Sequence, residues 1–273
     1  MPKLERGQTA LVTGASAGIG RAFARALAWR GLDVVLVARD VARLEALAVE
    51  LAASGVRADV LAADLGQPAE LARVEERLRA APVVDLLVNN AGLGAAGGFA
   101  DVPIAALEAQ IRVNIVAPTR LAHAALSGMR ARRSGGLIQI SSGAAFVPLL
   151  NNATYSGTKA YLSILSLTIA EELRHSGVAV LTVSPGFTRT EFQQRARADA
   201  SEVPALFWQS AEAVVDASLA AYEAGRSFVV TGAHNKLAVA LGRLVPLSWL
   251  GRVVGLVARL APQSAASPPS SPV

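Results

Sequence analysis

Short apolar runs rich in Val, Leu and Ile alternate with longer stretches of helical periodicity along most of the chain. The runs are continuous and do not alternate between apolar and polar residues, so both faces of each strand are expected to be buried. Such strands are parallel, because a crossover helix must return the chain to the same end of the sheet. The sequence therefore predicts an α/β protein with one doubly wound parallel sheet, a Rossmann fold of about seven strands with helices on both faces.

The predicted strands and helices follow one another in alternation. Strands are predicted at residues 9–13, 34–38, 58–62, 86–89, 137–141, 178–184 and 227–231. Helices are predicted at residues 19–30, 41–54, 68–80, 104–132, 153–176 and 211–224. The pair Asn151-Asn152 precedes the fifth helix, and we expect it to cap that helix because asparagine is a preferred N-cap residue.

The length suits one large domain followed by a distinct C-terminal region. With 273 residues, of which 52% are hydrophobic, the chain can bury a full core, and no linker-like stretch interrupts residues 8–232. We therefore expect one domain over residues 1–232. Residues 233–261 are predicted to form an apolar and basic helical extension, and residues 262–273, rich in Ser, Ala and Pro, a disordered tail.

The net charge of +5 is concentrated near the C-terminus. Acidic residues end at Glu223, whereas five basic residues follow it. These are Arg226, Lys236, Arg243, Arg252 and Arg259. Because the main domain lacks a basic cluster with interleaved aromatic residues, we expect no nucleic-acid partner.

Cysteine is absent, and His123, His175 and His234 are too far apart in sequence for a local ligand motif, so no metal site is predicted. The N-terminal residues MPKLERGQTA contain no apolar segment long enough for a signal peptide. These features predict an intracellular, cytoplasmic protein.

A glycine-rich segment, Thr13-Gly-Ala-Ser-Ala-Gly-Ile-Gly20, lies between the first strand and the first helix. Glycines there permit a tight turn and close approach of the backbone to a diphosphate, and the helix N-terminus then faces the anion. The spacing differs from the usual Gly-x-Gly-x-x-Gly, but its place in a strand–turn–helix unit favours a dinucleotide. The predicted contacts are Gly14, Ser16, Ala17, Gly18, Ile19 and Gly20.

The end of the second strand indicates which dinucleotide is preferred. The sequence there is Ala38-Arg39-Asp40, with no acidic residue on the strand itself. An acidic residue would bind the ribose 2′-hydroxyl of NAD, whereas an arginine accommodates the 2′-phosphate of NADP. We therefore expect NADP(H). The alternative is that Arg39 is a solvated loop charge and that Asp40 only caps the next helix.

Tyr155 and Lys159 lie four residues apart on one predicted helix, which places both side chains on the same face. A phenol ionises near pH 10, and a neighbouring cation favours the phenolate, so the phenol proton is expected to exchange closer to neutrality. A free hydroxyl, Ser142, precedes this pair in the sequence. Together these residues indicate the chemistry of a carbonyl reductase or alcohol dehydrogenase.

With these motifs placed, residues 7–232 resemble the short-chain dehydrogenase/reductase superfamily. The order of the motifs carries the resemblance, which implies a catalytic tetrad of Asn114, Ser142, Tyr155 and Lys159. It also implies that Asp64 and Leu65 contact the adenine and that the loop Asn89-Asn90-Ala91-Gly92 lies beside the cofactor. Further cofactor contacts implied by the resemblance are Pro185, Gly186, Thr188 and Thr190, which border the nicotinamide.

The resemblance also implies a role for each member of the tetrad. Tyr155 would donate a proton in reduction and accept one in oxidation, while Ser142 binds the reacting oxygen. Lys159 would favour the phenolate and hold the nicotinamide ribose, and Asn114 would hold a water in a proton relay. The hydride chemistry would belong to the cofactor.

The loops above the predicted strand ends are apolar, which suggests a hydrophobic carbonyl or alcohol substrate and a role in lipid metabolism. The alternative is that their side chains pack beneath the loops as part of the core. A mobile substrate lid is expected over about residues 187–210. The candidate pocket residues are Phe146, Val147, Leu149, Leu150, Phe187, Phe192, Phe207 and Trp208.

Two apolar helices with basic stripes are predicted in the extension, at residues 235–243 and 248–260. Such helices are suited to peripheral contact with an anionic membrane surface, or to covering the substrate pocket or a subunit interface. They cannot readily span a bilayer, because arginines and Pro246 interrupt every apolar stretch. The long helices at 104–132 and 153–176 are expected to pair with another subunit in a homodimer or homotetramer, as in many members of the superfamily.

Two other classes of function remain at this point. One is a catalytically silent NADP-binding sensor or scaffold protein, and the other is an epimerase or dehydratase acting on nucleotide-linked sugars. An intact tetrad disfavours the first. The early glycine spacing and the short C-terminal region disfavour the second.

Overall fold

The predicted strands form one parallel sheet in the computed structural model, which describes residues 2–196, 203–232, 235–237, 239 and 249. Its strand order is β3-β2-β1-β4-β5-β6-β7, so the doubly wound fold predicted from the apolar runs is confirmed. The strands are β1 (Thr9–Thr13), β2 (Asp33–Ala38), β3 (Ala58–Ala62), β4 (Leu86–Asn89), β5 (Gly135–Ile140), β6 (Val178–Ser184) and β7 (Phe228–Val230).

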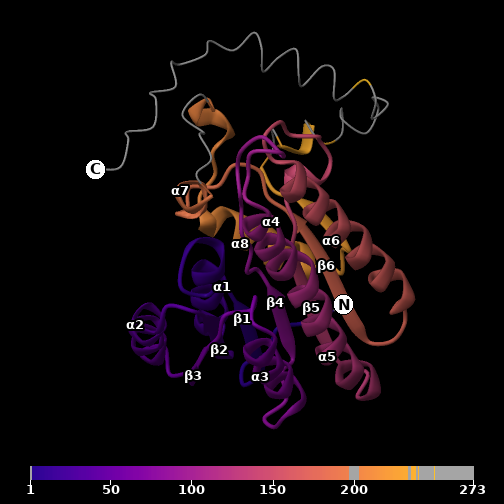
Figure 1. The fold of residues 1–273 in the computed structure, drawn as a ribbon. Coiled ribbons are helices and arrows are strands. Elements are labelled where there is room, and N and C mark those ends of the chain that lie inside the picture. The colour runs from indigo at the N-terminus through magenta and orange to yellow at the C-terminus, as the bar shows by residue number, and fades with distance from the viewer. Residues whose placement is uncertain (1, 197–202, 233–234, 238, 240–248, 250–273) are drawn as a thin grey trace.

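The helices connect these strands and cover both faces of the sheet (Figure 1). They are α1 (Gly18–Trp29), α2 (Val41–Ala52), α3 (Pro68–Arg79), α4 (Ile104–Ile111), α5 (Ala117–Ala131), α6 (Ala153–Glu172), α7 (Phe192–Arg195) and α8 (Ala211–Glu223). The short helix α7 was not predicted, because four residues carry too little periodicity to be recognised.

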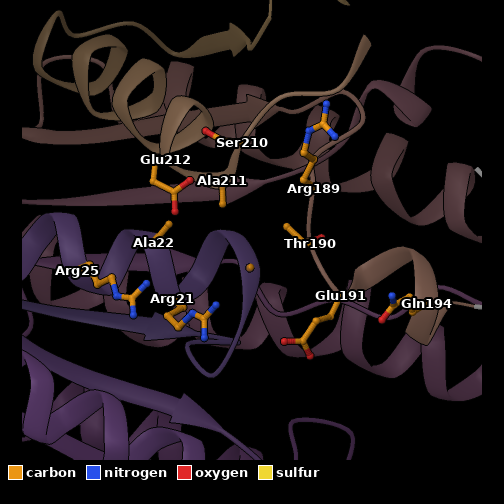
Figure 2. Close-up of a pocket in the computed structure, with 11 residues that line it drawn as sticks. Arg21, Ala22, Arg25, Arg189, Thr190, Glu191, Gln194, Ser210, Ala211 and Glu212 are labelled. Carbon is orange, nitrogen blue, oxygen red and sulfur yellow. The ribbon is translucent and has the colours of Figure 1, made fainter. Parts of the chain in front are cut away.

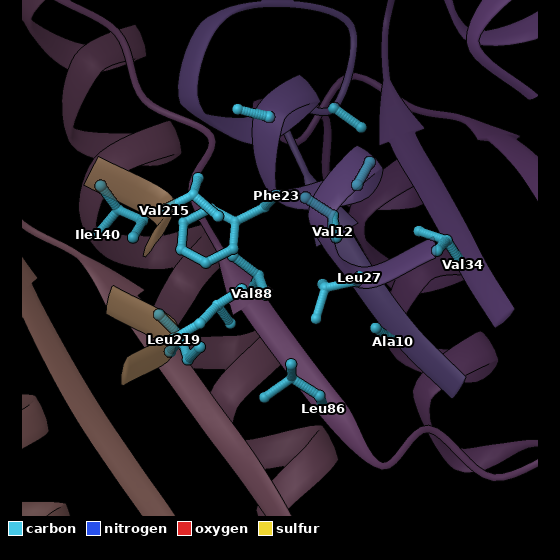
Figure 3. Close-up of a cluster of buried hydrophobic side chains, with 14 of the residues drawn as sticks. Ala10, Val12, Phe23, Leu27, Val34, Leu86, Val88, Ile140, Val215 and Leu219 are labelled. Atoms are coloured by element: carbon cyan, nitrogen blue, oxygen red, sulfur yellow. The ribbon is translucent and has the colours of Figure 1, made fainter. Parts of the chain in front are cut away.

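Two hydrophobic clusters hold the layers together. In one, Phe23 and Leu27 of α1 lie with Val12, Val88 and Ile140 of the sheet, and α2 and α8 add further apolar residues (Figure 3). The other cluster joins the opposite face of the sheet to α3, α5 and the last turns of α6. Successive strand residues therefore point into different clusters, which explains why the central strands are apolar throughout.

Strand β3 departs from the expectation that both faces are buried. It lies at one edge of the sheet, its Asp59 is exposed, and the Asp59 carboxylate pairs with Arg57 at 3.3 Å. Helix α2 packs against β3 as well as β2, but most side chains of β3 remain half-exposed. The prediction was wrong for this strand because an apolar run does not reveal whether a strand is central or at an edge.

The predicted continuous helix at 104–132 is interrupted by a π-helical turn, Arg112–Val116, between α4 and α5. Pro118 follows this turn at the start of α5 and has no backbone N–H to donate to the carbonyl of residue 114. The buried side chain of Asn114 lies in the same turn. Single π-helical turns are frequent at functional sites.

The expected asparagine cap of α6 is not formed. Asn152 occupies the N-cap position, but its side-chain amide donates to the Leu150 carbonyl at 3.2 Å instead of accepting from the helix. Asn151 adopts a left-handed conformation with φ of 59°, which asparagine tolerates. The prediction was therefore wrong about this cap, because the same amide also forms local turns.

Most of the predicted C-terminal extension lies outside the described residues, as does the whole predicted tail at 262–273. Of the extension, residues 235–237, 239 and 249 are described, and all of these are helical. Within the described part of the chain, no helix is both long and apolar enough to cross a membrane.

Candidate active site

The chain reverses its direction of winding between the neighbouring strands β1 and β4. In open α/β sheets, ligands bind where the strand order reverses, beyond the carboxyl ends of the strands. The glycine loop follows β1 at this edge, the Asn90–Gly92 loop follows β4, and Ser142 follows β5. Most of the residues predicted from sequence therefore meet at one edge of the sheet.

The glycine loop has the tight geometry that its sequence predicts. Gly14 and Gly18 have φ values of 66° and 52°, in the left-handed region that favours glycine. A Cβ atom on Gly20 would lie only 2.3 Å from the Gly14 carbonyl oxygen, so α1 packs closely against the turn. No side chain caps the N-terminus of α1, and its first backbone N–H groups suit a diphosphate. Ser16 is buried in the loop, and Ala17 is the N-cap residue.

The loop after β4 is fastened to the end of β1. The Thr13 hydroxyl accepts hydrogen bonds from the backbone N–H groups of Asn90, at 2.9 Å, and of Ala91, at 3.0 Å. The Asn90 side chain donates to the Thr13 carbonyl at 2.9 Å. These bonds hold the two loops side by side, so the Asn90 side chain supports the glycine turn. The role of Thr13 could be recognised in sequence only from its position before the first glycine.

The residues predicted for the adenosine end lie at the carboxyl ends of β2 and β3. Arg39 is exposed after β2, and Asp40 caps α2 by accepting from the Arg43 backbone N–H at 3.1 Å. The Asp40 cap therefore agrees with one of the two interpretations, and Arg39 forms no hydrogen bond or ion pair with another described residue. Asp64 accepts from the Gly66 N–H at 2.9 Å, and Leu65 is buried beside it.

Asn114 and Lys159 form a buried hydrogen-bonded corner behind this edge. The Asn114 side chain accepts from the Leu93 N–H at 2.8 Å and donates to the Leu93 carbonyl at 2.9 Å. It also donates to the Thr158 hydroxyl at 3.1 Å. The Lys159 ammonium donates to the Ile140 carbonyl at 2.9 Å, and burial lowers its pKa to about 8. Thr158 was not predicted, although it lies three residues after Tyr155 on the same helix.

Tyr155 and Ser142 face each other at the mouth of this corner. Burial raises the pKa of the Tyr155 phenol to about 12, and a hydrogen bond with Ser142 opposes part of that rise. The Lys159 ammonium lies 5.8 Å from the centre of the Tyr155 ring and donates to a backbone carbonyl. The predicted shift of the phenol toward neutrality is therefore wrong for the chain by itself, because the loss of hydration outweighs the nearby cation.

The segment after β6 borders the same site. The Pro185 carbonyl accepts from the Gly143 N–H at 2.8 Å, which ties this segment to the turn that follows Ser142. The Thr188 hydroxyl donates to the Gly186 carbonyl at 3.0 Å. Thr190 packs on the glycine loop, since a Cβ atom on Gly18 would lie 3.0 Å from the Thr190 side chain.

Asn235, the first described residue of the predicted extension, contacts the segment after β6. A Cβ atom on Gly186 would lie 1.9 Å from the Asn235 amide nitrogen, so the two residues are in close contact. The same amide donates to the Thr231 carbonyl at 3.0 Å. The start of the extension therefore packs against the predicted nicotinamide border.

The predicted apolar pocket residues do not all gather around Tyr155. Phe192 does, with its ring centre 5.6 Å from that of Tyr155, and it also packs near Gly94. Phe146 instead packs edge-on against Phe228 of β7 at 5.7 Å. Phe187 pairs with Trp208 at 5.6 Å. Val147 is half-buried, and Leu149, Leu150 and Phe207 are exposed on the rim.

A polar cavity of about 460 Å³ lies between α1, the residues before and within α7, and the N-terminus of α8 (Figure 2). Gly18 and Thr190 line it, together with Arg21, Arg25 and Glu212. It includes none of the four predicted catalytic residues, so it adjoins the glycine loop from outside the catalytic corner. Among the described residues, no three His, Cys, Asp or Glu side chains are grouped closely enough to hold a metal ion.

Comparison with known proteins identifies the family. A family model described as short chain dehydrogenase matches residues 8–201, so the chain belongs to the short-chain dehydrogenase family. A serine 3-dehydrogenase of Agrobacterium fabrum is 38% identical over 189 residues, which cover 67% of this chain and 73% of that protein.

Two solved structures extend the similarity over nearly the whole fold. A short-chain dehydrogenase from Sphingobium yanoikuyae in complex with NADPH is 36% identical, with a TM-score of 0.80, covering 96% of this chain and 99% of the other. A bulky-bulky ketone specific alcohol dehydrogenase from Comamonas testosteroni is 32% identical, with a TM-score of 0.76 and coverage of 95% and 97%.

Proposed function

We propose that this protein is an NADP(H)-dependent oxidoreductase that reduces a carbonyl group of a hydrophobic small molecule or oxidises the corresponding secondary alcohol. The observation that carries the proposal is the position of the Tyr155 phenol, which lies near enough to Ser142 for that hydroxyl to lower its pKa and beside the buried Lys159 at the carboxyl edge of the sheet. Membership of the short-chain dehydrogenase family supports the same class of reaction.

The glycine loop and its surroundings fit a dinucleotide. Positive φ values at Gly14 and Gly18, the uncapped start of α1 and the exposed Arg39 supply a turn, an anion site and a cation for the 2′-phosphate. Gly92 leaves room beside Lys159, since a Cβ atom there would lie 3.5 Å from the Lys159 ammonium. The NADPH and NADP in similar structures support this assignment. When bound, the cofactor supplies or accepts the hydride.

Tyr155 is the proposed general acid in reduction and general base in oxidation. A phenol with a pKa of about 12 remains protonated at neutral pH, so it is ready to donate to an oxygen on which negative charge develops. Ser142 shares a hydrogen bond with Tyr155 and is placed to bind the same oxygen as it gains charge. At neutral pH Tyr155 is therefore in the protonated form that carbonyl reduction requires.

Lys159 and Asn114 are the proposed supports of that proton transfer. With a pKa of about 8, Lys159 is mostly protonated at neutral pH, and its positive charge near the Tyr155 ring favours loss of the phenol proton during turnover. Asn114 holds the Leu93 backbone and Thr158 together and so orients α6. We propose that this network also guides a proton from Lys159 toward water.

The substrate is proposed to be a hydrophobic ketone or secondary alcohol. Phe192 stands beside Tyr155, and exposed apolar side chains at Leu149, Leu150 and Phe187 lie on neighbouring loops. One similar structure is an alcohol dehydrogenase specific for bulky-bulky ketones, and one relative is a very-long-chain 3-oxoacyl-CoA reductase. These proteins support a large apolar substrate and a role in lipid metabolism.

We extend the proposal to assembly and location. Ile111, Val116, Tyr161 and Ile164 expose apolar surface on α4, the π-helical turn and α6, which suits a homodimer or homotetramer. We also propose a substrate lid over about residues 187–210, peripheral membrane contact through the C-terminal extension, and a cytoplasmic location. Multi-angle light scattering of the full chain tests the assembly, and a monomer at micromolar concentration would contradict it.

The direct test is to supply a panel of long-chain and polycyclic ketones and to monitor NADPH oxidation by the absorbance at 340 nm. We expect turnover with at least one bulky ketone and little with small hydrophilic ones. Tight NADPH binding without turnover on any ketone or alcohol would contradict the proposal and favour a silent NADP-binding protein.

A further inference from the structure

One short segment crosses the nucleotide side of the sheet and touches two elements that flank the nucleotide site. The Thr190 side chain packs on Gly18 at the turn before α1. The next residue, Glu191, reaches α2, where its carboxylate oxygens lie 2.9 and 2.7 Å from one Arg43 guanidinium nitrogen. Figure 2 shows Thr190 and Glu191 in succession, facing the helix that carries Arg21 and Arg25. The segment thus spans from the diphosphate turn to the ribose corner.

The ribose corner, formed by Arg39, Asp40 and Arg43, holds a second arginine besides the one assigned to the 2′-phosphate. Arg43 lies in the first turn of α2, just after Arg39 and Asp40. The Asp40 carboxylate caps that helix and lies 3.3 Å from the Arg43 side chain. Glu191 also pairs with Arg195 at 2.5 Å. Hydrogen bonding to Arg43 is the main cause that keeps the pKa of Glu191 below its ordinary value, so the carboxylate is charged at neutral pH.

We propose that Arg43 is a second ligand of the NADP 2′-phosphate, beside Arg39, and that Glu191 competes with that phosphate for Arg43. This inference rests on the proposed function. A phosphate presents more charge and more acceptor oxygens than a carboxylate, and arginine binds either in the same forked geometry. NAD carries a hydroxyl at this position and leaves the Glu191–Arg43 pair intact.

The competition links cofactor identity to the catalytic corner. Phe192 follows Glu191 directly, begins α7 and lies 5.6 Å from the Tyr155 ring. When the 2′-phosphate takes Arg43, the segment that positions Phe192 loses its tie to α2. The same segment therefore touches both the proposed phosphate ligand and the wall of the proposed substrate pocket.

The expected effects are modest because the pair is exposed. Arg43 and Glu191 keep 46% and 37% of their side-chain surface in water, and exposed ion pairs contribute little to stability. Releasing Arg43 from Glu191 should therefore tighten NADP binding by about two- to five-fold. Removing Arg43, which then costs a charge-assisted bond to the phosphate, should weaken binding by about ten-fold or more.

The test measures binding by calorimetry with the full chain, using NADPH, NADH and the nicotinamide-free probes adenosine 2′,5′-bisphosphate and 5′-AMP. We expect Glu191→Gln to tighten NADPH and the bisphosphate, and to leave NADH and 5′-AMP unchanged. We expect Arg43→Ala to weaken only the two 2′-phosphorylated ligands. In the double variant, Glu191→Gln should have no further effect, because its partner is gone.

The double variant separates competition from a general charge effect, which would persist without Arg43. Glu171→Gln is the matched control, since it removes the same charge from another exposed pair, Glu171–Arg174 at the C-terminal end of α6, and should leave all four affinities unchanged. An unchanged NADPH affinity in Glu191→Gln, or equal tightening in the Arg43→Ala background, would overturn the competition. If the wild-type chain does not bind NADPH, the proposed function falls as well.

Discussion

The buried corner around Lys159 and the exposed corner around Arg43 both carry charge, but they hold it in different ways. Lys159 is 3% exposed, and its ammonium is fixed by one backbone carbonyl. Asn114 is fully buried, and three hydrogen bonds hold its amide. Arg43 and Glu191 instead meet at the surface, and within the described part of the chain neither side chain bonds to the backbone. The corner around Lys159 is therefore held by buried hydrogen bonds, whereas the Arg43–Glu191 ion pair can exchange its partners with a ligand.

The two corners therefore suit different tasks, proton transfer at the buried corner and cofactor recognition at the exposed one. Proton transfer needs atoms held within a few tenths of an ångström, which buried hydrogen bonds provide. Recognition of a charged ligand needs groups that a ligand can recruit at small cost, which exposed ion pairs provide. We therefore expect changes at the buried corner to alter stability strongly and changes at exposed positions to alter it weakly.

The largest effect on stability is expected from Gly20→Ala. The new Cβ atom would lie 2.3 Å from the Gly14 carbonyl oxygen and 2.4 Å from the Asn90 amide, both held in place by the loops around β1 and β4. The turn must therefore open, at about 3 kcal/mol or more, and NADPH affinity should fall by more than about 100-fold. Urea unfolding and calorimetry measure the two effects. A variant with unchanged stability would show that the turn is not closely packed.

Lys159→Met should stabilise the cofactor-free protein at neutral pH while abolishing activity. Burial lowers the Lys159 pKa from 10.5 to about 8. Below pH 8 the buried side chain is charged, and the cost of burying that charge destabilises the folded state. Between about pH 8 and 10.5 the unfolded wild-type chain binds more protons than the folded one, so wild-type stability rises with pH there. The advantage of the variant, about 1–3 kcal/mol, should therefore be greatest below pH 8 and vanish near pH 10.5.

Urea unfolding of both proteins at intervals from pH 6 to about pH 10 tests this expectation. A variant that is less stable than the wild type at every pH would contradict it. That result would mean that the bond to the Ile140 carbonyl outweighs the cost of burying the charge.

Thr158→Val is expected to have an intermediate effect. The Thr158 hydroxyl donates to the Tyr155 carbonyl at 2.8 Å and accepts from the Asn114 amide at 3.1 Å. Its loss removes one buried partner of Asn114 and should cost about 1–2 kcal/mol, with a loss of turnover as α6 loosens. Thr119→Val is the control, because the Thr119 hydroxyl bonds to the Ile115 carbonyl and the Tyr161 hydroxyl but not to the Asn114 side chain. Equal losses in the two variants would remove the special role of Thr158.

The smallest effect is expected from Gly157→Ala, on the exposed side of α6. A Cβ atom there would meet nothing within 4 Å, and alanine is the better helix former. We expect a gain of about 0.5–1 kcal/mol, measured by urea unfolding. Because the substitution is the same as at Gly20, opposite signs at the two positions would confirm the contrast between the buried and the exposed region.

The sheet could be predicted from sequence because its signal is local. Continuous apolar runs such as Leu86–Asn89 identify buried parallel strands, and the glycine spacing identifies the turn after β1. The position of β3 at an edge could not be predicted in this way, since apart from Asp59 its residues are apolar like those of the central strands. The π-helical turn at Arg112–Val116 was missed for a similar reason, because it depends on Pro118 and on the partners of Asn114.

At the candidate site, residue types were easier to predict than their electrostatics. The spacing of Tyr155 and Lys159 placed both on one face of α6, but it did not show that burial raises the pKa of the phenol to about 12. The contact between Arg43 and Glu191 joins residues 148 positions apart, which no local pattern can reveal. Long-range contacts and burial are properties of the packed chain, so they required the structure.

The most direct test of the account is the Tyr155→Phe variant, with NADPH affinity and turnover of a responsive bulky ketone measured side by side. The variant keeps the ring beside Phe192 and loses only the hydroxyl that bonds Ser142. We expect an NADPH dissociation constant within about two-fold of the wild type and a loss of turnover of about 10²–10⁴-fold. Normal NADPH binding with wild-type turnover would contradict the assignment of Tyr155 as the proton donor.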